Sequence, residues 1–332
     1  MKNTSNVKIK SIGIYHPENK VTNEYYIDHF DNQGKDIRRL LEAYGRDERY
    51  IVDNDEDNTV TMGIKASLEA LEKANLKGDD IDIILFSCLI PEYTMPPQAI
   101  IVHNAIKGKK EALIMDTNIG CVGMIGAMDT AVRYLKTHKN FKRALIIGSD
   151  CMSAHCREDD ELTYPQFGDL GCAVIIEKTD EDSDFYGSKY VTDSSNWNLV
   201  KYPASGNKEN YQYDNVYDRK IDWQPFDGNI SVEQGANSMK ELLSEIDIKV
   251  SDVNAFCVSQ FAAGIGQNFT SYLGVEKSKA PYVGNKYGYT GTSSPFLALY
   301  ESIKSGRVKR GDYVGLWSVG VNWTTCALVF KY

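Results

Sequence analysis

The sequence contains no apolar run approaching the roughly 20 residues that a membrane-spanning helix requires. Its first residues, MKNTSNVKIK, lack the apolar core of a secretory signal peptide. Basic residues are outnumbered, because 37 Lys and Arg stand against 46 Asp and Glu, giving a net charge of −9. This balance argues against a general nucleic-acid binder, which would present a basic face. We therefore expect a cytoplasmic protein that contacts neither a membrane nor nucleic acid.

The cysteines do not form the pattern of a disulfide framework. There are 7 of them, an odd number, and Cys88 and Cys257 lie within the apolar runs IILFSCLI and AFCVSQF. Such positions are typical of reduced thiols in a cytosolic protein. His155 lies between Cys151 and Cys156, but no second ligand pair follows, so no metal site is predicted.

The order of predicted elements repeats. The chain has 332 residues, 42% of them hydrophobic, which is enough for one large α/β unit or two ordinary domains. In the first half, helix 59–74, strand 83–88 and helix 98–106 precede a strand with a glycine-bearing turn, a long helix and two further strands. The second half repeats this order from helix 231–246, strand 254–259 and helix 264–273, with a short strand expected at 280–283.

This order predicts an internal duplication of a mixed α/β unit. Two such units packed back to back would bury their helices in the middle, in five layers of the order α-β-α-β-α. Most strands are continuous apolar runs, as expected for sheets covered on both faces. We assign residues 1–178 to an N-terminal half, 179–228 to a lid or insertion, and 229–332 to a C-terminal half.

Residues 113–134, LIMDTNIGCVGMIGAMDTAVRY, contain the strongest candidate for a nucleophile. An apolar strand meets a short polar turn, and Cys121 follows directly before helical spacing begins. A cysteine at a helix N-terminus is predicted to have a lowered pKa, because the unpaired amides and the macrodipole favour the thiolate. The alternative is an ordinary buried cysteine, since free Cys is among the most buried residue types.

Several segments together resemble the thiolase fold and, more closely, the β-ketoacyl-acyl-carrier-protein synthase III family. They include GRDERYI at 45–51, TMGIKASLEAL at 61–71, the cysteine segment, ALIIGSD at 144–150, FGDLGCAVI at 167–175, YGYTGTSSPFLAL and SGRVKRGDYVGLWSVGVNW. The resemblance covers nearly the whole chain and implies the five-layer thiolase fold. It also implies an acyltransferase whose substrate is a coenzyme A or phosphopantetheinyl thioester, with no bound cofactor.

By this resemblance Cys121 takes the acyl group from acyl-CoA or an acyl carrier protein. The oxyanion hole would consist of the backbone N–H groups of Cys121 and Gly320. Met95 matches a position that reaches across a dimer interface to the partner's acyl pocket. The alternative interpretation is that Met95 is an ordinary core residue. Phe261 is a second candidate for the acyl pocket. A homodimer is expected, or a heteromer with other thiolase-like subunits.

The sequence departs from the family at two positions. The family's histidine opens a His-Gln-Ala-Asn-like motif, and we place Gln260 at that histidine position. The family's asparagine is matched by Tyr289. The 5 histidines end at His155, so no histidine follows in the second half. His155 itself is an auxiliary candidate, with a loop histidine as its alternative reading.

These departures weaken decarboxylative condensation, because losing one electrostatic donor typically costs on the order of 100-fold in rate. We therefore expect transfer of the acyl group to an acceptor that is already nucleophilic, in specialised polyketide or fatty-acid-like metabolism. One alternative is a largely non-catalytic subunit of a heteromeric thiolase-like acyltransferase. Another is a standard initiating synthase with an unusual triad.

Overall fold

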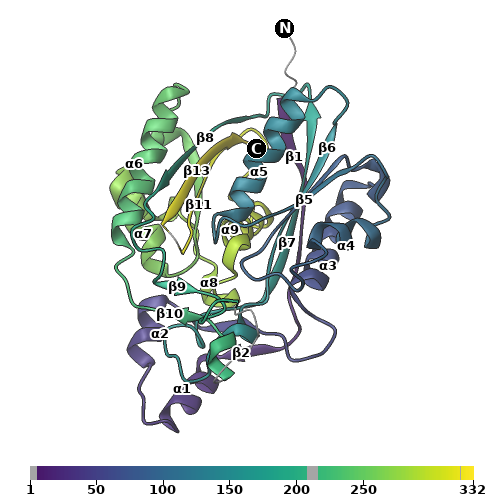
Figure 1. Cartoon of the computed structure of the whole chain (residues 1–332). Coiled ribbons are helices and arrows are strands. Elements are labelled where there is room, and N and C mark those ends of the chain that lie inside the picture. Colours follow the sequence, from purple (N-terminus) through teal and green to yellow (C-terminus); the bar gives the residue numbers. More distant parts are fainter. Residues whose placement is uncertain (1–5, 208–215, 322) are drawn as a thin grey trace.

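Two mixed β-sheets face each other across a pair of buried helices in the computed structural model, which describes residues 6–207, 216–321 and 323–332 (Figure 1). The first sheet has the strand order β1 (Asn6–Tyr15), β7 (Leu170–Thr179), β6 (Arg143–Asp150), β4 (Ile83–Ser87) and β5 (Leu113–Thr117). The second has the order β11 (Val253–Val258), β12 (Tyr313–Val319), β13 (Thr324–Lys331) and β8 (Phe185–Thr192).

Helices cover both sheets on the outside and lie between them on the inside. Helices α3 (Thr59–Ala74) and α4 (Gln98–Ala105) pack on the outer face of the first sheet. Helices α6 (Asn229–Glu245) and α7 (Ala263–Leu273) pack on the outer face of the second. This arrangement confirms the predicted thiolase-type α/β fold. Figure 1 shows the layers across the molecule in the order outer helices, sheet, inner helices, sheet and outer helices.

The middle layer consists of α5 (Gly123–Thr137) and α9 (Ser294–Lys304), and one hydrophobic core joins it to the inner faces of both sheets. Met124 and Met128 of α5 and Leu297 of α9 are fully buried. The apolar face of an amphipathic helix is stable only when it packs against a core. Burial of these two helices therefore holds the halves together.

The two sheets share one topology. β1–β7 and β7–β6 are antiparallel and β6–β4 is parallel; β8–β13 and β13–β12 are antiparallel and β12–β11 is parallel. Strand β8 is thus the counterpart of β1, although residues 185–192 fall within the range predicted as a lid. The assignment of three domains stays a prediction.

The short strand expected at 280–283 is absent among the described residues, and the helix α8 (Gly284–Tyr287) follows instead. Pro281 has no N–H to donate to a strand ladder. The N–H of Val283 donates to Oε1 of Gln260 at 2.8 Å. The side chain of Gln260 thus accepts the hydrogen bond that a carbonyl group of a neighbouring strand would otherwise accept.

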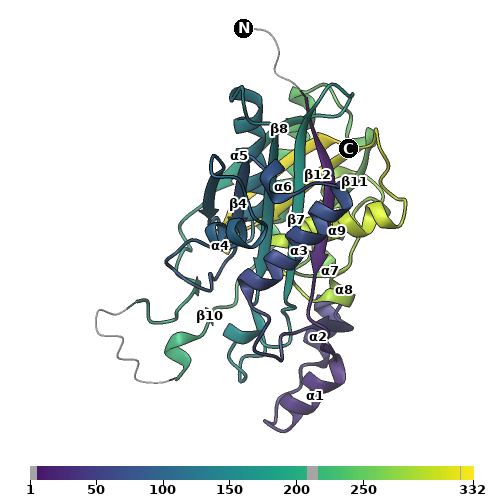
Figure 2. The same ribbon diagram turned by 90° about the vertical axis from the view of Figure 1, so that its right-hand side faces the viewer.

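The remaining elements gather at one end of the sheets. They are β2 (Lys20–Thr22), α1 (Asn23–Asp31), α2 (Arg38–Tyr44), β3 (Glu48–Tyr50), β9 (Val200–Lys201) and β10 (Asp222–Trp223). Figure 2 shows α1 and α2 extending beyond α8 at this end. Residues 208–215 of the predicted lid lie outside the described residues. No helix in the described part of the chain combines the length and the apolar character needed to cross a membrane.

The contact of α3 with β1 gives a stability prediction. A Cβ at Gly13 would lie 2.3 Å from the carbonyl oxygen of Ala66 and 2.6 Å from the backbone nitrogen of Ala70. Gly13→Ala should therefore lower the free energy of unfolding by about 1–3 kcal/mol, because α3 must shift. Urea unfolding followed by circular dichroism measures this. Leu68→Ala, an exposed change on α3, is the control, and equal effects of both variants would contradict the prediction.

Candidate active site

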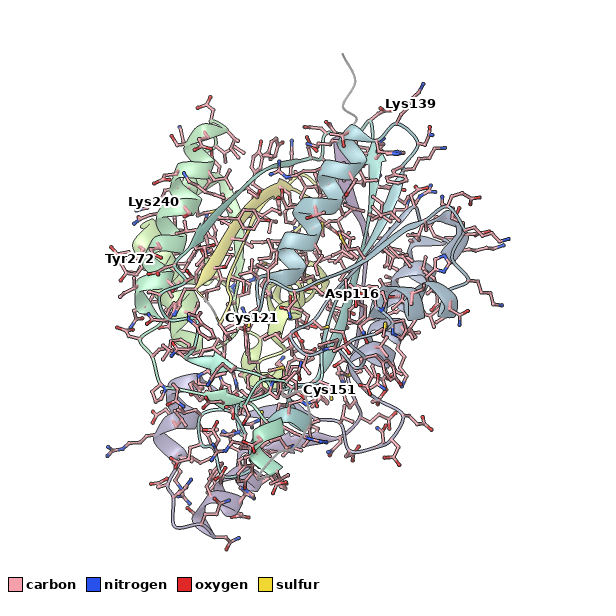
Figure 3. The ribbon with its side chains drawn as sticks, viewed as in Figure 1. Asp116, Cys121, Lys139, Cys151, Lys240 and Tyr272 are labelled. Atoms are coloured by element: carbon pink, nitrogen blue, oxygen red, sulfur yellow. The ribbon has the colours of Figure 1, made fainter. Side chains whose placement is uncertain are left out.

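Cys121 lies where β5 passes into α5, between the two sheets (Figure 3). Gly120 has φ +57°, a conformation that glycine adopts without strain, and it turns the chain toward the helix. The first turn of α5 is fixed from the second half of the chain, because the N–H of Met124 donates to Oγ1 of Thr292 at 2.7 Å. The chain folds here as the strand–turn–helix pattern predicts.

Two backbone N–H groups and one phenol contact the thiol. The N–H groups of Cys121 and Val321 and the phenol of Tyr289 lie close enough to the sulfur to lower its pKa. The carbonyl oxygen of Cys121 accepts from Oγ of Ser318 at 3.0 Å. Cys121 and Tyr289 are each 2% exposed. The thiol is therefore enclosed by groups from segments far apart in the sequence.

Burial raises the pKa of the Cys121 thiol to about 12, and this outweighs the hydrogen bond from Tyr289. The negative charge of Asp150 raises the same pKa further, while the two backbone N–H groups lower it. The expectation that the helix N-terminus lowers this pKa is wrong, because desolvation of the thiolate dominates. In the ligand-free protein the thiol is therefore neutral at pH 7.

The predicted oxyanion contact at Gly320 is not available in this structure. The N–H of Gly320 donates to the carbonyl oxygen of Thr324 at 2.7 Å. The next residue, Val321, supplies the N–H that faces the sulfur. Gly320 still lines the space beside Cys121. The turn is in the predicted place, and the N–H beside the sulfur belongs to Val321.

Gln260 is not directed at Cys121. Its Nε2 donates to the carbonyl oxygens of Val258 at 2.7 Å and Pro281 at 3.3 Å, and its Oε1 accepts from the N–H of Val283. Ser259 instead faces the space beside Cys121. Neighbouring residues of an extended chain point to opposite sides, so a shift of one position changes which side chain meets the site. The family motif could have indicated this. When the glutamine of the His-Gln-Ala-Asn-like motif is aligned with Gln260, the histidine position falls on Ser259.

One cavity is lined by Cys121, and a second begins at the neighbouring Gly120. The first, of about 320 Å³, contains Cys121 in its wall. Its other lining residues are Trp223, Phe226, Asp227, Gly228, Asn229, Ser231, Val232, Ser259, Phe261, Ala262, Gly264, Ile265, Asn268, Tyr289, Val319, Gly320, Val321 and Trp323. The second cavity, of about 260 Å³, is lined by Leu89, Ile90, Asn118, Gly120, Met152, Trp197, Val200, Lys201, Tyr202, Ile221, Trp223 and Val321. Trp223 and Val321 form walls of both.

Phe261 thus lies in the first cavity, whereas Met95 and His155 line neither. Met95 is 85% exposed on the loop before α4. The ring of His155 packs edge-on against Tyr202 at 4.9 Å. Burial lowers the pKa of His155 to about 4, and nearby Lys220 lowers it further. His155 is therefore neutral at pH 7 and the structure does not bring it to the thiol.

Asp150, at the end of β6, was not anticipated. It is fully buried, and its carboxyl accepts from the N–H groups of Leu89 at 2.6 Å and Thr292 at 2.9 Å. Burial raises its pKa to about 8, opposed by these two hydrogen bonds. Asp150 thus connects Leu89, in the wall of the second cavity, to Thr292, whose side chain also hydrogen-bonds the first turn of α5.

The described residues contain no group of three or more His, Cys, Asp or Glu arranged to hold a metal ion. Cys151, His155 and Cys156 therefore do not form one.

Comparisons with known proteins agree with this fold and site. The family described as 3-oxoacyl-[acyl-carrier-protein] synthase III matches residues 115–194, and its C-terminal family matches residues 243–332. β-Ketoacyl-[acyl-carrier-protein] synthase III 1 of Bacillus anthracis is 30% identical over 97% of this chain and 98% of its own. The corresponding synthase III of Aquifex aeolicus is 28% identical over 98% of this chain and 99% of its own.

Solved structures give the same result. The synthase III of Aquifex aeolicus VF5 superposes with a TM-score of 0.84 at 28% identity, covering 98% of this chain and 100% of the other. The priming β-ketosynthase of the R1128 polyketide pathway has a TM-score of 0.88 at 19% identity, covering 100% and 98%, and so supports the fold alone.

The fold and the comparisons define a thiolase-fold enzyme of the acyl-transferring, condensing class. Its sequence places it more narrowly: the chain belongs to the β-ketoacyl-acyl-carrier-protein synthase III family.

The raised pKa predicts how Cys121 reacts in the free protein. Below the pKa of about 12, the thiolate fraction grows about tenfold for each pH unit, so alkylation by iodoacetamide should accelerate without a plateau between about pH 7 and 10. Peptide mass spectrometry of Cys121 measures the rate. Tyr289→Phe should slow it several-fold, because a hydrogen bond that favours the thiolate is lost.

Tyr272→Phe is the matched control, since Tyr272 lies on the outer surface of α7 (Figure 3). A plateau near pH 7, or equal rates for both tyrosine variants, would contradict the prediction.

Proposed function

We propose that this protein transfers an acyl group from a coenzyme A or acyl-carrier-protein thioester to an acceptor by way of Cys121. The observation that carries this proposal is the position of Cys121 in the wall of the first cavity, with two backbone N–H groups beside its sulfur. The second cavity begins at its neighbours Gly120 and Val321. One cavity can admit the thioester while the other receives the acyl chain. A thiol exchanges readily with a thioester once it is deprotonated.

Acylation proceeds by exchange of thiols. The sulfur of Cys121 attacks the thioester carbonyl, a new C–S bond forms, and the bond to the donor sulfur breaks. The proton of Cys121 ends on the departing thiol, and the Tyr289 phenol, which lies beside the sulfur, can pass it on. The N–H groups of Cys121 and Val321 stabilise the oxyanion. Since the thiol is neutral when free, deprotonation accompanies attack.

We infer that Ser259 and Tyr289 stand where the family has histidine and asparagine. Both line the first cavity beside Cys121. Neither side chain can carry a positive charge, although both can donate a hydrogen bond. This supports transfer to an acceptor that is already nucleophilic over decarboxylation of a malonyl thioester.

Acylation can be tested directly by intact mass spectrometry. Incubation with acetyl-CoA, octanoyl-CoA and octanoyl-acyl carrier protein should add one acyl mass, which hydroxylamine removes because the link is a thioester. Cys121→Ala should abolish the adduct, whereas Cys257→Ala, a change in the buried core, should keep it. Absence of an adduct with every donor would refute the proposal.

Two further measurements separate the alternative functions. A non-catalytic subunit of a heteromer would co-purify with another thiolase-like chain whose activity tolerates Cys121→Ala. A standard initiating synthase would release carbon dioxide from malonyl-acyl carrier protein once Cys121 is acylated.

We further propose a homodimer in which the partner's loop closes the second cavity. β5 pairs only with β4 and so leaves an open sheet edge among the described residues, next to α4. Met95 is exposed on the loop before α4, and Trp197 is 64% exposed beside the second cavity. Two copies joined along their β5 edges would cover these apolar groups.

Met95→Trp tests this arrangement. A larger side chain entering the partner's cavity should shift acylation toward shorter acyl-CoA chains, while the first cavity is untouched. Chain-length profiles of kcat/KM measure the shift, and analytical ultracentrifugation measures the oligomeric state. Leu68→Trp, on the outer surface of α3, is the control; a monomer, or an unchanged profile, would refute the dimer proposal.

A further inference from the structure

The first cavity has a charge pattern that bears on the acceptor. Among the residues that the structure describes, its lining includes no Lys, Arg or His, and Asp227 is its one charged side chain. The carboxylate of Asp227 accepts from the N–H of Asn229 at 2.9 Å. An anionic substrate would have to give up its hydration here without a cation to replace it. The cavity is therefore suited to an uncharged second substrate.

Five aromatic side chains line this cavity: Trp223, Phe226, Phe261, Tyr289 and Trp323. Trp223 stacks on Phe261 with ring centroids 5.7 Å apart and planes 5° apart. Phe226 contacts Trp323 edge-on at 4.8 Å, and Tyr289 contacts Phe261 edge-on at 5.2 Å. Flat rings pack favourably by offset stacking and edge contacts with such walls. An aromatic compound fits this lining better than a flexible chain does.

Within the described part of the chain, two buried polar atoms of the cavity's lining residues have no hydrogen-bond partner. Ser259 is 1% exposed, and its Oγ makes no hydrogen bond of normal geometry, although it lies near the Tyr289 phenol. Nε1 of Trp323 is also buried without a partner. Burying an unpaired donor costs free energy that a ligand can restore. Because indole N–H can only donate, the ligand must offer acceptor oxygens.

We propose that the second substrate is an uncharged aromatic hydroxy compound that carries a further oxygen acceptor, held in the first cavity by Ser259 and Trp323. This rests on the acyl transfer proposed above and names its acceptor. The hydroxyl oxygen attacks the carbonyl of the acyl-Cys121 thioester, a C–O bond forms and the C–S bond breaks. The hydroxyl proton ends on the Cys121 sulfur, so the thiol is regenerated.

Binding tests this without any acyl transfer. 4-Hydroxyacetophenone and 4-hydroxybenzoate are similar in shape and differ in charge, and either would quench the fluorescence of Trp223 and Trp323. The neutral compound should bind at least about tenfold more tightly, since the carboxylate is desolvated without a partner. Ser259→Ala should weaken that binding about tenfold. Ser271→Ala, an exposed change on α7, should leave it unchanged.

Turnover gives the second test. Protein acylated with octanoyl-CoA, and freed of donor, should transfer octanoyl to 4-hydroxyacetophenone and not to 4-hydroxybenzoate or malonyl-CoA. Equal binding of the two phenols, or discharge by malonyl-CoA with release of carbon dioxide, would overturn the inference while leaving acylation of Cys121 intact. Failure of acylation with every donor would instead refute the proposed function, and the binding preference would still decide the nature of the ligand.

Discussion

Burial of α5 and α9 between the two sheets determines where everything else in the molecule can lie. Both helices place apolar side chains toward both sheets, so each half of the chain exposes them unless the other half is present. Cys121 precedes the first turn of α5 and therefore lies at the centre of the molecule. The hydrogen bond from Met124 N–H to Thr292 fixes that turn against the segment that leads into α9. The position of Cys121 is thus a property of the interface between the two halves.

That position has an electrostatic consequence. A buried thiol loses most of the hydration that a thiolate needs, and its pKa rises accordingly. Tyr289, Val321 and the Cys121 N–H provide directed hydrogen bonds in place of water. Such groups are most effective toward charge that develops during a reaction, because they are already oriented. The site is therefore arranged for a neutral resting thiol.

The sequence predicted the architecture well because periodicity and burial are local signals. Helix 59–74 was found at the predicted bounds, and Cys121 lies at a strand–helix junction as expected. β8 was missed because its FYGSKYVT pattern is that of a partly exposed strand, with one buried residue. The site was harder to predict. Whether Ser259 or Gln260 faces the cavity depends on the direction of one side chain after β11, and the pKa of Cys121 depends on residues brought in by distant loops.

Because β8 is the counterpart of β1, the segment 193–228 has a counterpart in the first half of the chain. In the first half, residues 16–58 separate β1 from α3; in the second, residues 193–228 separate β8 from α6. Both segments are thus inserted at the same point of the repeated unit, after its first strand and before the first helix of its outer layer. Wall residues such as Trp223 and Phe226 belong to one of these twin loops. Because this loop lies outside the two large sheets, changes in its length can reshape the first cavity without shifting the strand register of either sheet.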